Sequence, residues 1–226
     1  MPSIQPIAPY PMPGADDLPA TVPAWRPSPR RAVLLIHDMQ RFFLRPYADG
    51  RSPRRELVGN VAALRDGCAA AGVPVAYTAQ NGGMTASQRG LLADFWGPGM
   101  RTDPDDQHVI DELRPGPGDW RFAKWRYSAF VRSALLATMR AHDRDQLIVC
   151  GVYAGVGVLM TAVEAFSNDI ETFVVADAVA DFSARRHRQA LDYAAANCAV
   201  VLPTERLLAA LRAERAAAAG RAGRPR

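Results

Sequence analysis

The sequence has few cysteines, and their positions argue against two classes of protein. The chain of 226 residues holds three, Cys68, Cys150 and Cys198, and no two of them form a C-x-x-C pair. Zinc sites commonly use such pairs, and nothing in the sequence suggests a disulfide framework. We therefore expect neither a metal ion nor a disulfide, which fits a reducing cytoplasm.

The sequence also lacks long apolar runs and any segment that resembles a signal peptide. No apolar stretch approaches the length of a transmembrane helix. Residues 1–30 are rich in proline and carry neither a basic start nor an apolar core. We expect a cytoplasmic protein that does not bind membranes, in which residues 1–30 form an extended arm over the domain or over a neighbouring subunit.

Basic residues exceed acidic ones, but their pattern is not typical of nucleic-acid binding. The chain holds 27 Lys and Arg against 23 Asp and Glu, for a net charge of +4. Residues 212–226 carry five of the Arg without interleaved aromatic residues. We expect one domain over residues 31–211, a basic flexible tail over residues 212–226, and no nucleic-acid partner.

Short apolar runs alternate with amphipathic segments along the chain. The runs predict six strands, at 32–37, 73–79, 120–124, 146–151, 172–176 and 198–202. The spacing of apolar residues predicts helices that end near Gly72, lie around 87–95, 107–113, 128–142, 158–167 and 183–196, and begin at 204. This alternation is typical of a single α/β domain around a mostly parallel sheet.

Polar side chains follow the first four predicted strands. They are Asp38, Gln80, Lys124 and Tyr153. The carboxyl ends of parallel strands meet at one edge of a sheet, where ligands bind. A partly buried Asp38 would have a raised pKa and serve as an acid or base, although it could instead cap a helix starting near Met39. Gly157 opens a helix whose N–H groups suit an anion.

No cysteine is placed to act as a nucleophile. Cys150 lies inside a predicted strand and Cys198 starts one, and neither has a histidine nearby in the predicted arrangement. Alternation turns His37 away from Asp38, so we expect it to be structural or to hydrogen-bond from behind the site. The residues therefore do not support a covalent mechanism.

A dinucleotide site is an alternative. Gly155 and Gly157 follow a strand and open a helix, and Asp177 follows the next strand, as in part of the dinucleotide-binding fingerprint. The third glycine position is Met160, which is too large for close helix–strand packing. We do not favour this alternative and expect no cofactor.

Six ordered blocks of the sequence resemble the isochorismatase family. They are Leu34–Gln40, Tyr77–Gln80, Asp94–Gly99, Lys124–Phe130, Gly151–Ala154 and Val175–Ser183. The resemblance extends from the arm to about residue 210. It implies the isochorismatase-like hydrolase fold, a three-layer α/β sandwich related to cysteine hydrolases, and we expect a homodimer.

The resemblance also implies a set of site residues. Cysteine hydrolases use an Asp, a Lys and a Cys, which fall on Asp38, Lys124 and Gly157. True isochorismatases share this glycine and cleave an enol ether without a covalent intermediate. The resemblance gives these three positions catalytic roles. It places Phe42, Gln80, Arg89, Trp96, Tyr127, Tyr153 and Gly157 at the substrate. Arg89 could instead be an exposed helix residue, and Gly155 replaces a histidine common in relatives.

The resemblance implies a small-molecule substrate with two carboxylates. Residues 41–46 and 166–170 resemble the phenazine-type enzymes, which hydrolyse 2-amino-2-deoxyisochorismate to trans-2,3-dihydro-3-hydroxyanthranilate and pyruvate. The alternative is isochorismatase, which converts isochorismate to 2,3-dihydro-2,3-dihydroxybenzoate and pyruvate. Siderophore members often carry an aryl carrier domain, and we expect no carrier-protein domain in this chain.

Two other classes of function stay open. The first is a non-catalytic scaffold that binds a pathway partner through its basic surface. The second is an amidase of the cysteine-hydrolase type, which would release ammonia and be sensitive to thiol reagents. Glycine at position 157 does not support the second.

Overall fold

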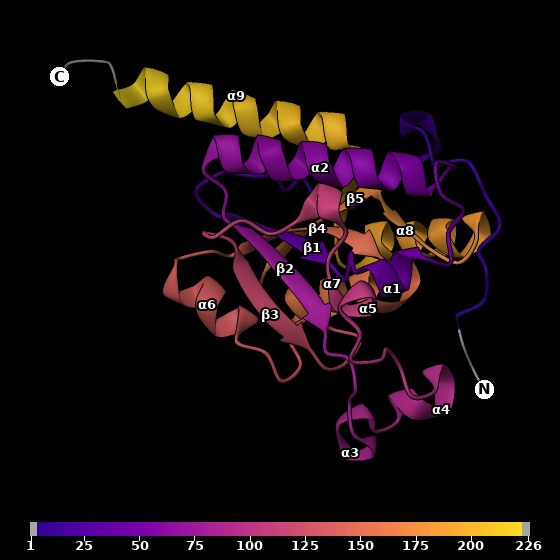
Figure 1. Ribbon diagram of the computed structural model, residues 1–226. Coiled ribbons are helices and arrows are strands. Elements are labelled where there is room, and N and C mark those ends of the chain that lie inside the picture. The colour runs from indigo at the N-terminus through magenta and orange to yellow at the C-terminus, as the bar shows by residue number, and fades with distance from the viewer. Residues whose placement is uncertain (1–3, 223–226) are drawn as a thin grey trace.

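A six-stranded parallel sheet forms the centre of the computed structural model, which describes residues 4–222 (Figure 1). Its strands are β1 (Ala32–His37), β2 (Val75–Gln80), β3 (Trp120–Lys124), β4 (Gln146–Val152), β5 (Glu171–Ala180) and β6 (Val200–Leu202). They lie in the order β3-β2-β1-β4-β5-β6, and every neighbouring pair is parallel. The predicted sheet is confirmed.

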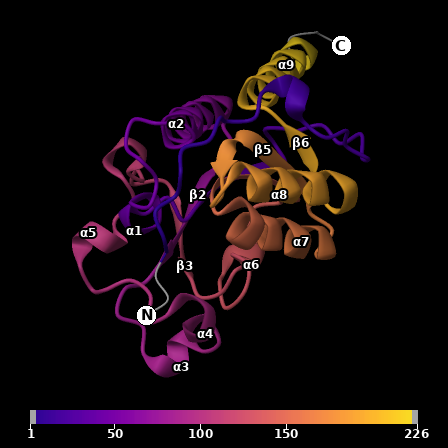
Figure 2. The same ribbon diagram turned by 90° about the vertical axis from the view of Figure 1, so that its right-hand side faces the viewer.

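Helices cover both faces of the sheet, which makes three layers (Figure 2). One face is covered by α2 (Arg54–Ala71) and α9 (Thr204–Ala222), and the other by α6 (Leu135–Ala141), α7 (Leu159–Ser167) and α8 (Ala184–Asn197). Short elements connect the layers: α1 (Arg41–Leu44), α3 (Ala86–Arg89), α4 (Leu92–Trp96), α5 (Pro104–Gln107), η1 (Ala15–Asp17), η2 (Asp111–Leu113) and η3 (Ala154–Val158). No helix within residues 4–222 is long and apolar enough to cross a membrane.

The central strand β1 is buried on both faces. Leu34 and Ile36 pack toward α2, whereas Val33 and Leu35 pack toward α7 and α8. Both sets are aliphatic, because a strand covered by helices on either side cannot alternate with polar residues. This run therefore holds the site residues that follow it in a rigid position.

The predicted end of one helix and the predicted start of another are confirmed. The apolar stripe of α2 is buried, and the helix ends at Gly72, whose φ of 79° is the left-handed conformation that glycine adopts without strain. The hydroxyl of Ser183 accepts a hydrogen bond from the Arg186 N–H at 3.3 Å and so caps α8.

Three predicted helices differ from the observed ones. The helix expected over 128–142 begins only at Leu135, because side-chain hydroxyls engage the N–H groups of Ala129 and Phe130. The helix expected over 87–95 is divided into α3 and α4 at Gly90, which has a φ of 52°. The predicted helix over 107–113 is likewise only the short η2.

Three strand boundaries also differ. β2 begins after Pro74, which has no N–H for the ladder. β6 begins at Val200, because the N–H groups of Cys198 and Ala199 both bond to the last turn of α8. β5 continues to Ala180, because its pairing with β4 resumes at Gly151 and Val152 after a register shift.

Both ends of the described chain pack on the domain. Ile7 and Tyr10 of the arm are buried, and the Tyr10 hydroxyl donates to the Asp181 carbonyl at 3.1 Å. The tail predicted from residue 212 begins too early, because α9 continues to Ala222 through alanines and arginines that favour helix. Residues 223–226 of that predicted tail lie outside the described residues.

Candidate active site

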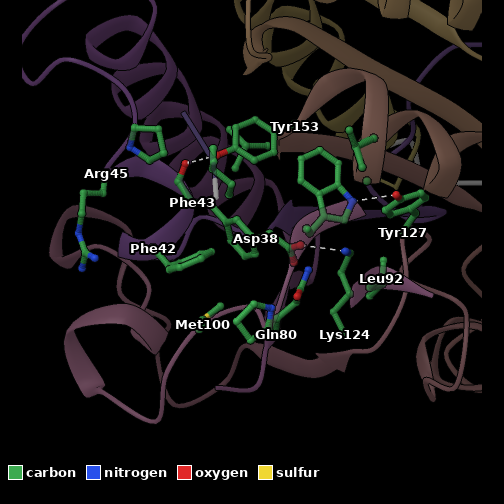
Figure 3. Close-up of a pocket in the computed structure, with 18 of the residues that line it drawn as sticks. Asp38, Phe42, Phe43, Arg45, Gln80, Leu92, Met100, Lys124, Tyr127 and Tyr153 are labelled. Atoms are coloured by element: carbon green, nitrogen blue, oxygen red, sulfur yellow. Dashed lines mark hydrogen bonds and ion pairs between the residues drawn. The ribbon is translucent and has the colours of Figure 1, made fainter. Parts of the chain in front are cut away.

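A cavity of about 520 Å³ opens at the carboxyl ends of the strands (Figure 3). All nine residues that the sequence placed at the site line it: Asp38, Phe42, Gln80, Arg89, Trp96, Lys124, Tyr127, Tyr153 and Gly157. Their roles remain predictions, but their convergence on one cavity is observed. The register explains it, because His37 lies beside Thr78 and Gln80 beside Lys124 in adjacent parallel strands.

The cavity also has walls that the sequence did not predict. Ile4 and Pro6 of the arm line it, as do Arg45 and Met100. The arm has no periodic pattern from which this contact could be predicted. Arg45 lies in the segment 41–46, which we noted only because it resembles the phenazine-type enzymes. The position of Arg45 soon after β1 was the one sign in the sequence that it could lie at the site.

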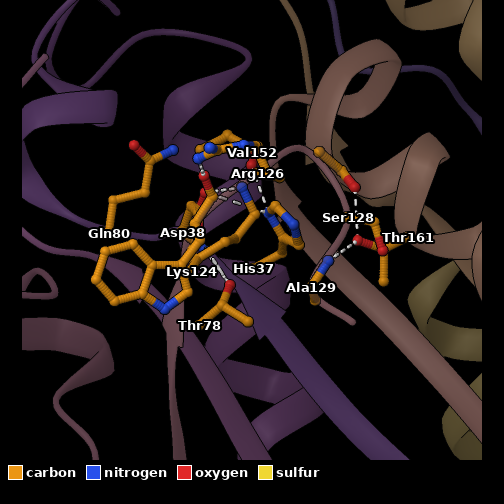
Figure 4. Close-up of polar contacts among 12 residues, drawn as sticks. His37, Asp38, Thr78, Gln80, Lys124, Arg126, Ser128, Ala129, Val152 and Thr161 are labelled. Carbon is orange, nitrogen blue, oxygen red and sulfur yellow. Dashed lines mark hydrogen bonds and ion pairs between the residues drawn. The ribbon is translucent and has the colours of Figure 1, made fainter. Parts of the chain in front are cut away.

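The floor of the cavity holds a buried ion pair (Figure 4). The Lys124 Nζ lies 2.9 Å from Asp38 Oδ2, and the side chains are 3% and 5% exposed. Thr78 donates its hydroxyl to Asp38 Oδ1 at 2.7 Å. Asp38 has a φ of 52°, a conformation rare for residues other than glycine, and its carboxyl contacts side chains of β2 and β3. Each carboxyl oxygen thus has a donor.

The ion pair keeps Asp38 charged. Burial would raise the pKa of the carboxyl, but the charge of Lys124, with smaller contributions from His37 and the Thr78 hydrogen bond, outweighs burial and holds the pKa below its usual value. The raised pKa expected from the sequence is therefore wrong for the free protein. The sequence could not show that Lys124 would be within hydrogen-bond distance.

His37 packs behind Asp38 as a neutral imidazole. It is fully buried, and burial lowers its pKa to about 4. Its Nδ1 lies 2.9 Å from the Val152 carbonyl and 3.7 Å from Asp38 Oδ2. Because a carbonyl only accepts, Nδ1 carries the proton. We expected His37 to be structural or to hydrogen-bond from behind the site, and which of the two roles holds stays a prediction.

Arg89 brings a positive charge into the cavity wall. It is only 6% exposed, so the reading of an exposed helix residue is wrong. Its Nε donates to the Gly97 carbonyl at 3.0 Å, and Nη1 donates to Gln80 Oε1 at 3.3 Å. Within residues 4–222, no salt bridge involves this guanidinium. Its charge is available to an anion.

Aromatic side chains fasten the segment 85–99 over the cavity. Trp96 donates its indole N–H to the Tyr127 hydroxyl at 2.8 Å and stacks on Phe182. Phe182 in turn stacks on Tyr153, with ring centres 4.2 Å apart. The Tyr153 hydroxyl donates to the Phe43 carbonyl at 2.6 Å. Its proton is thus used inside the protein, and the role of Tyr153 at the substrate stays a prediction.

Neighbouring side chains explain why position 155 is glycine and hold the backbone of Gly157 in place. A Cβ on Gly155 would lie 2.9 Å from Asp181 Oδ2, which accepts the Gly155 N–H. A histidine at position 155 would displace that carboxyl. The Gly157 carbonyl accepts from the Thr161 hydroxyl at 2.7 Å, which holds the start of α7 against the cavity.

The dinucleotide alternative finds no support in the geometry. Asp177 accepts from the N–H and hydroxyl of Thr204 at 2.8 and 2.7 Å and so caps α9. Its carboxyl is therefore committed to the fold. Within residues 4–222, no group of three or more His, Cys, Asp or Glu side chains is placed to hold a metal ion.

Comparisons with known proteins agree with this geometry. A model of the isochorismatase domain matches residues 32–206. Phenazine biosynthesis protein PhzD1 of Pseudomonas aeruginosa is 59% identical over 208 residues, covering 92% of this chain and 100% of that protein. An isochorismatase of Bacillus subtilis is 50% identical over 206 residues, covering 91% of this chain and 66% of that protein.

Solved structures share the fold. A cysteine hydrolase from Pseudomonas syringae pv. phaseolicola superimposes with a TM-score of 0.76 at 24% identity, covering 87% of this chain and 98% of that one. An N-carbamoylsarcosine amidase from Thermoplasma acidophilum has a TM-score of 0.65 at 29% identity, covering 77% and 97%. The three-layer α/β sandwich expected from the sequence is confirmed.

Proposed function

The chain is a member of the isochorismatase family, and we propose that it is a hydrolase that cleaves the enolpyruvyl ether of 2-amino-2-deoxyisochorismate. The products are trans-2,3-dihydro-3-hydroxyanthranilate and pyruvate. The observation that carries this proposal is the buried Asp38 carboxyl in a cavity whose other charges are cationic, with glycine at the position of a nucleophile. The 59% identity to PhzD1 supports this choice of substrate.

Asp38 acts as a general acid in the proposed mechanism. Its carboxylic O–H transfers a proton to the methylene carbon of the vinyl ether, and the electron pair of the double bond forms the new C–H bond. The resulting oxocarbenium ion adds water and returns a proton to Asp38. The hemiketal then collapses to pyruvate and the ring alcohol as its C–O bond breaks. Glycine at position 157 offers no nucleophile for a covalent route.

The substrate's own charge explains how Asp38 becomes an acid. The two carboxylates of the substrate change the charge balance at Arg89 and Lys124, because they compete with Asp38 for these cations. Arg45 adds nothing to this balance, because its guanidinium lies 2.7 Å from an Asp106 oxygen. A substrate carboxylate that attracts Lys124 weakens the ion pair, so burial then raises the pKa of Asp38.

The alternative substrate is isochorismate. The 50% identity to an isochorismatase supports it, and the cavity discriminates weakly. Asp38 is the only carboxylate among the described residues that line the cavity. A ring ammonium must therefore use Asp38 or a backbone carbonyl, and a ring hydroxyl fits the same acceptors.

Pyruvate release tests the proposal. Each compound is incubated with the protein, pyruvate is followed by coupling to lactate dehydrogenase, and kcat/KM values are compared. We expect activity on both, with preference for the amino compound. Asp38→Ala should lose most of kcat while substrate still binds, whereas the exposed-surface control Asp66→Asn should not.

Each possible outcome has a distinct meaning. A preference for isochorismate would overturn the substrate and keep the reaction class. Absence of pyruvate from both compounds would favour the scaffold, and ammonia release from amides would favour an amidase. Near-normal turnover by Asp38→Ala would overturn the mechanism.

A further inference from the structure

Gly157 has no space for any side chain. An ideal Cβ at this position would lie 2.2 Å from Cε1 of His37, 2.9 Å from its Nε2 and 3.1 Å from its Nδ1. The first two distances are shorter than real Cβ contacts. Gly157 is therefore required by the imidazole that faces it across the floor of the site.

The imidazole cannot move aside easily. It is fully buried at the end of β1, and its Nδ1–H is held by the Val152 carbonyl at the end of β4. The same nitrogen lies 3.7 Å from the Asp38 carboxylate. Figure 4 draws both residues. Displacing the ring would break a buried hydrogen bond and change the surroundings of Asp38. It is a rigid ring in a packed site and not the far end of a flexible side chain.

We propose that His37 is a positioning residue that occupies the volume a nucleophilic side chain at position 157 would need. By filling this volume, the ring lets the Gly157 backbone form the cavity wall and holds the Asp38 carboxyl in place for proton transfer. The role of His37 in proton transfer rests on the proposed function, whereas its steric role does not.

The alternative explanation is that Gly157 is required by its own backbone conformation. Its φ is not in the left-handed region that favours glycine, so this reason does not apply. Its carbonyl already bonds to the Thr161 hydroxyl, and Gly157 itself lies within η3. The close contact with His37 therefore explains why position 157 is glycine.

A double-mutant cycle on thermal stability tests the steric claim without any substrate. Gly157→Ala should lower Tm by roughly 3–10 °C, because overpacking a core costs that much in a chain of this size. His37→Ala should also lower Tm, through the space it leaves. The double variant should be at least as stable as His37→Ala, because the new methyl group enters that space.

Additive losses in the double variant would overturn the steric claim. If Gly157→Ala does not fold alone but folds together with His37→Ala, the claim is supported. If it folds in neither background, the claim is overturned. Gly67, which faces the Leu208 side chain on the far layer, gives a matched control: Gly67→Ala should lose the same Tm with and without His37→Ala.

Thiol labelling tests what the vacated volume permits. In the His37→Ala, Gly157→Cys variant, iodoacetamide should modify one thiol, detected by mass spectrometry, because that thiol would lie at the cavity near Lys124. The wild type and His37→Ala should stay unlabelled, since Cys68, Cys150 and Cys198 are all buried. A wild-type Tm and full labelling of Gly157→Cys alone would overturn the proposal.

Turnover tests the positioning role separately. His37→Ala should lower kcat for pyruvate release with little change in KM, and the double variant His37→Ala, Gly157→Ala should keep this low kcat even where its Tm recovers. Recovery of kcat together with Tm in the double variant would overturn the positioning role and leave the steric claim. Absence of pyruvate from the wild type itself would refute the proposed function while the Tm cycle and the labelling still decide the steric claim.

Discussion

Replacement of Lys124 by methionine should make the stability of the fold depend on pH. The Lys124 and Asp38 side chains are 3% and 5% exposed, and their charged atoms lie 2.9 Å apart. Methionine keeps most of the volume but leaves the carboxylate buried without a cation. Removing one partner of a buried pair typically costs about 3–5 kcal/mol, so we expect a loss of this size near neutral pH.

The direction of the pH dependence follows from proton binding. In the wild type, the folded-state pKa of Asp38 lies below the unfolded value. The stabilisation that Asp38 contributes to the fold is therefore complete above about pH 5 and is lost only as pH falls through the folded-state pKa. In Lys124→Met, burial outweighs the remaining interactions and raises that pKa. The folded state then binds a proton that the unfolded state lacks, and stability falls as pH rises, by up to about 1.4 kcal/mol per pH unit.

Urea unfolding between about pH 5 and pH 8 checks this reasoning. The free energy of unfolding of Lys124→Met should approach the wild-type value at the acid end and diverge from it at the alkaline end. The control is the double variant Asp38→Asn, Lys124→Met, in which neither member of the pair carries a charge and the extra pH dependence should vanish. An equal loss at every pH, or the same slope in the double variant, would refute the assignment.

Three further outcomes follow from the site. Arg89→Gln should raise KM about 10- to 100-fold, because a charge-assisted hydrogen bond to a carboxylate is lost, and the surface control Arg65→Gln should not. A stable dianionic analogue should take up close to one proton on binding, measured calorimetrically in two buffers, and no uptake would contradict protonation of Asp38. Trp96→Phe should raise KM by roughly 2- to 10-fold, because the bond to Tyr127 is lost while the stacking remains, and an unchanged KM would show that this bond does not hold the segment closed.

The site residues were predictable because each follows a strand. A parallel sheet aligns its carboxyl ends, so the position of a polar residue after an apolar run already gives its place in space. This reasoning, together with the family resemblance, placed Asp38, Gln80 and Lys124 correctly. It also fixed the strand β1, whose apolar run is continuous because helices cover both faces.

Properties that depend on a pair of side chains were not predictable. The lowered pKa of Asp38 follows from its 2.9 Å contact with Lys124, which depends on the length and direction of the lysine chain. The hydroxyl of Tyr153 was expected in the cavity, but its proton goes to Phe43, a residue with no polar side chain to signal the bond. The wall formed by Ile4 comes from a segment without periodicity.

Asp38 is charged in the free protein, whereas a general acid must carry a proton. Both statements hold only if substrate binding changes the Asp38–Lys124 ion pair. In the free site, the ion pair is neutral overall and both oxygens of the carboxylate are occupied by donors, so Asp38 is a poor acid. The two carboxylates of the substrate compete with Asp38 for the nearby cations, and a carboxylate that attracts Lys124 removes the charge that holds the pKa of Asp38 low. The acid is therefore formed with the substrate in place, where carbon protonation can follow and where burial keeps the carboxyl neutral until it does.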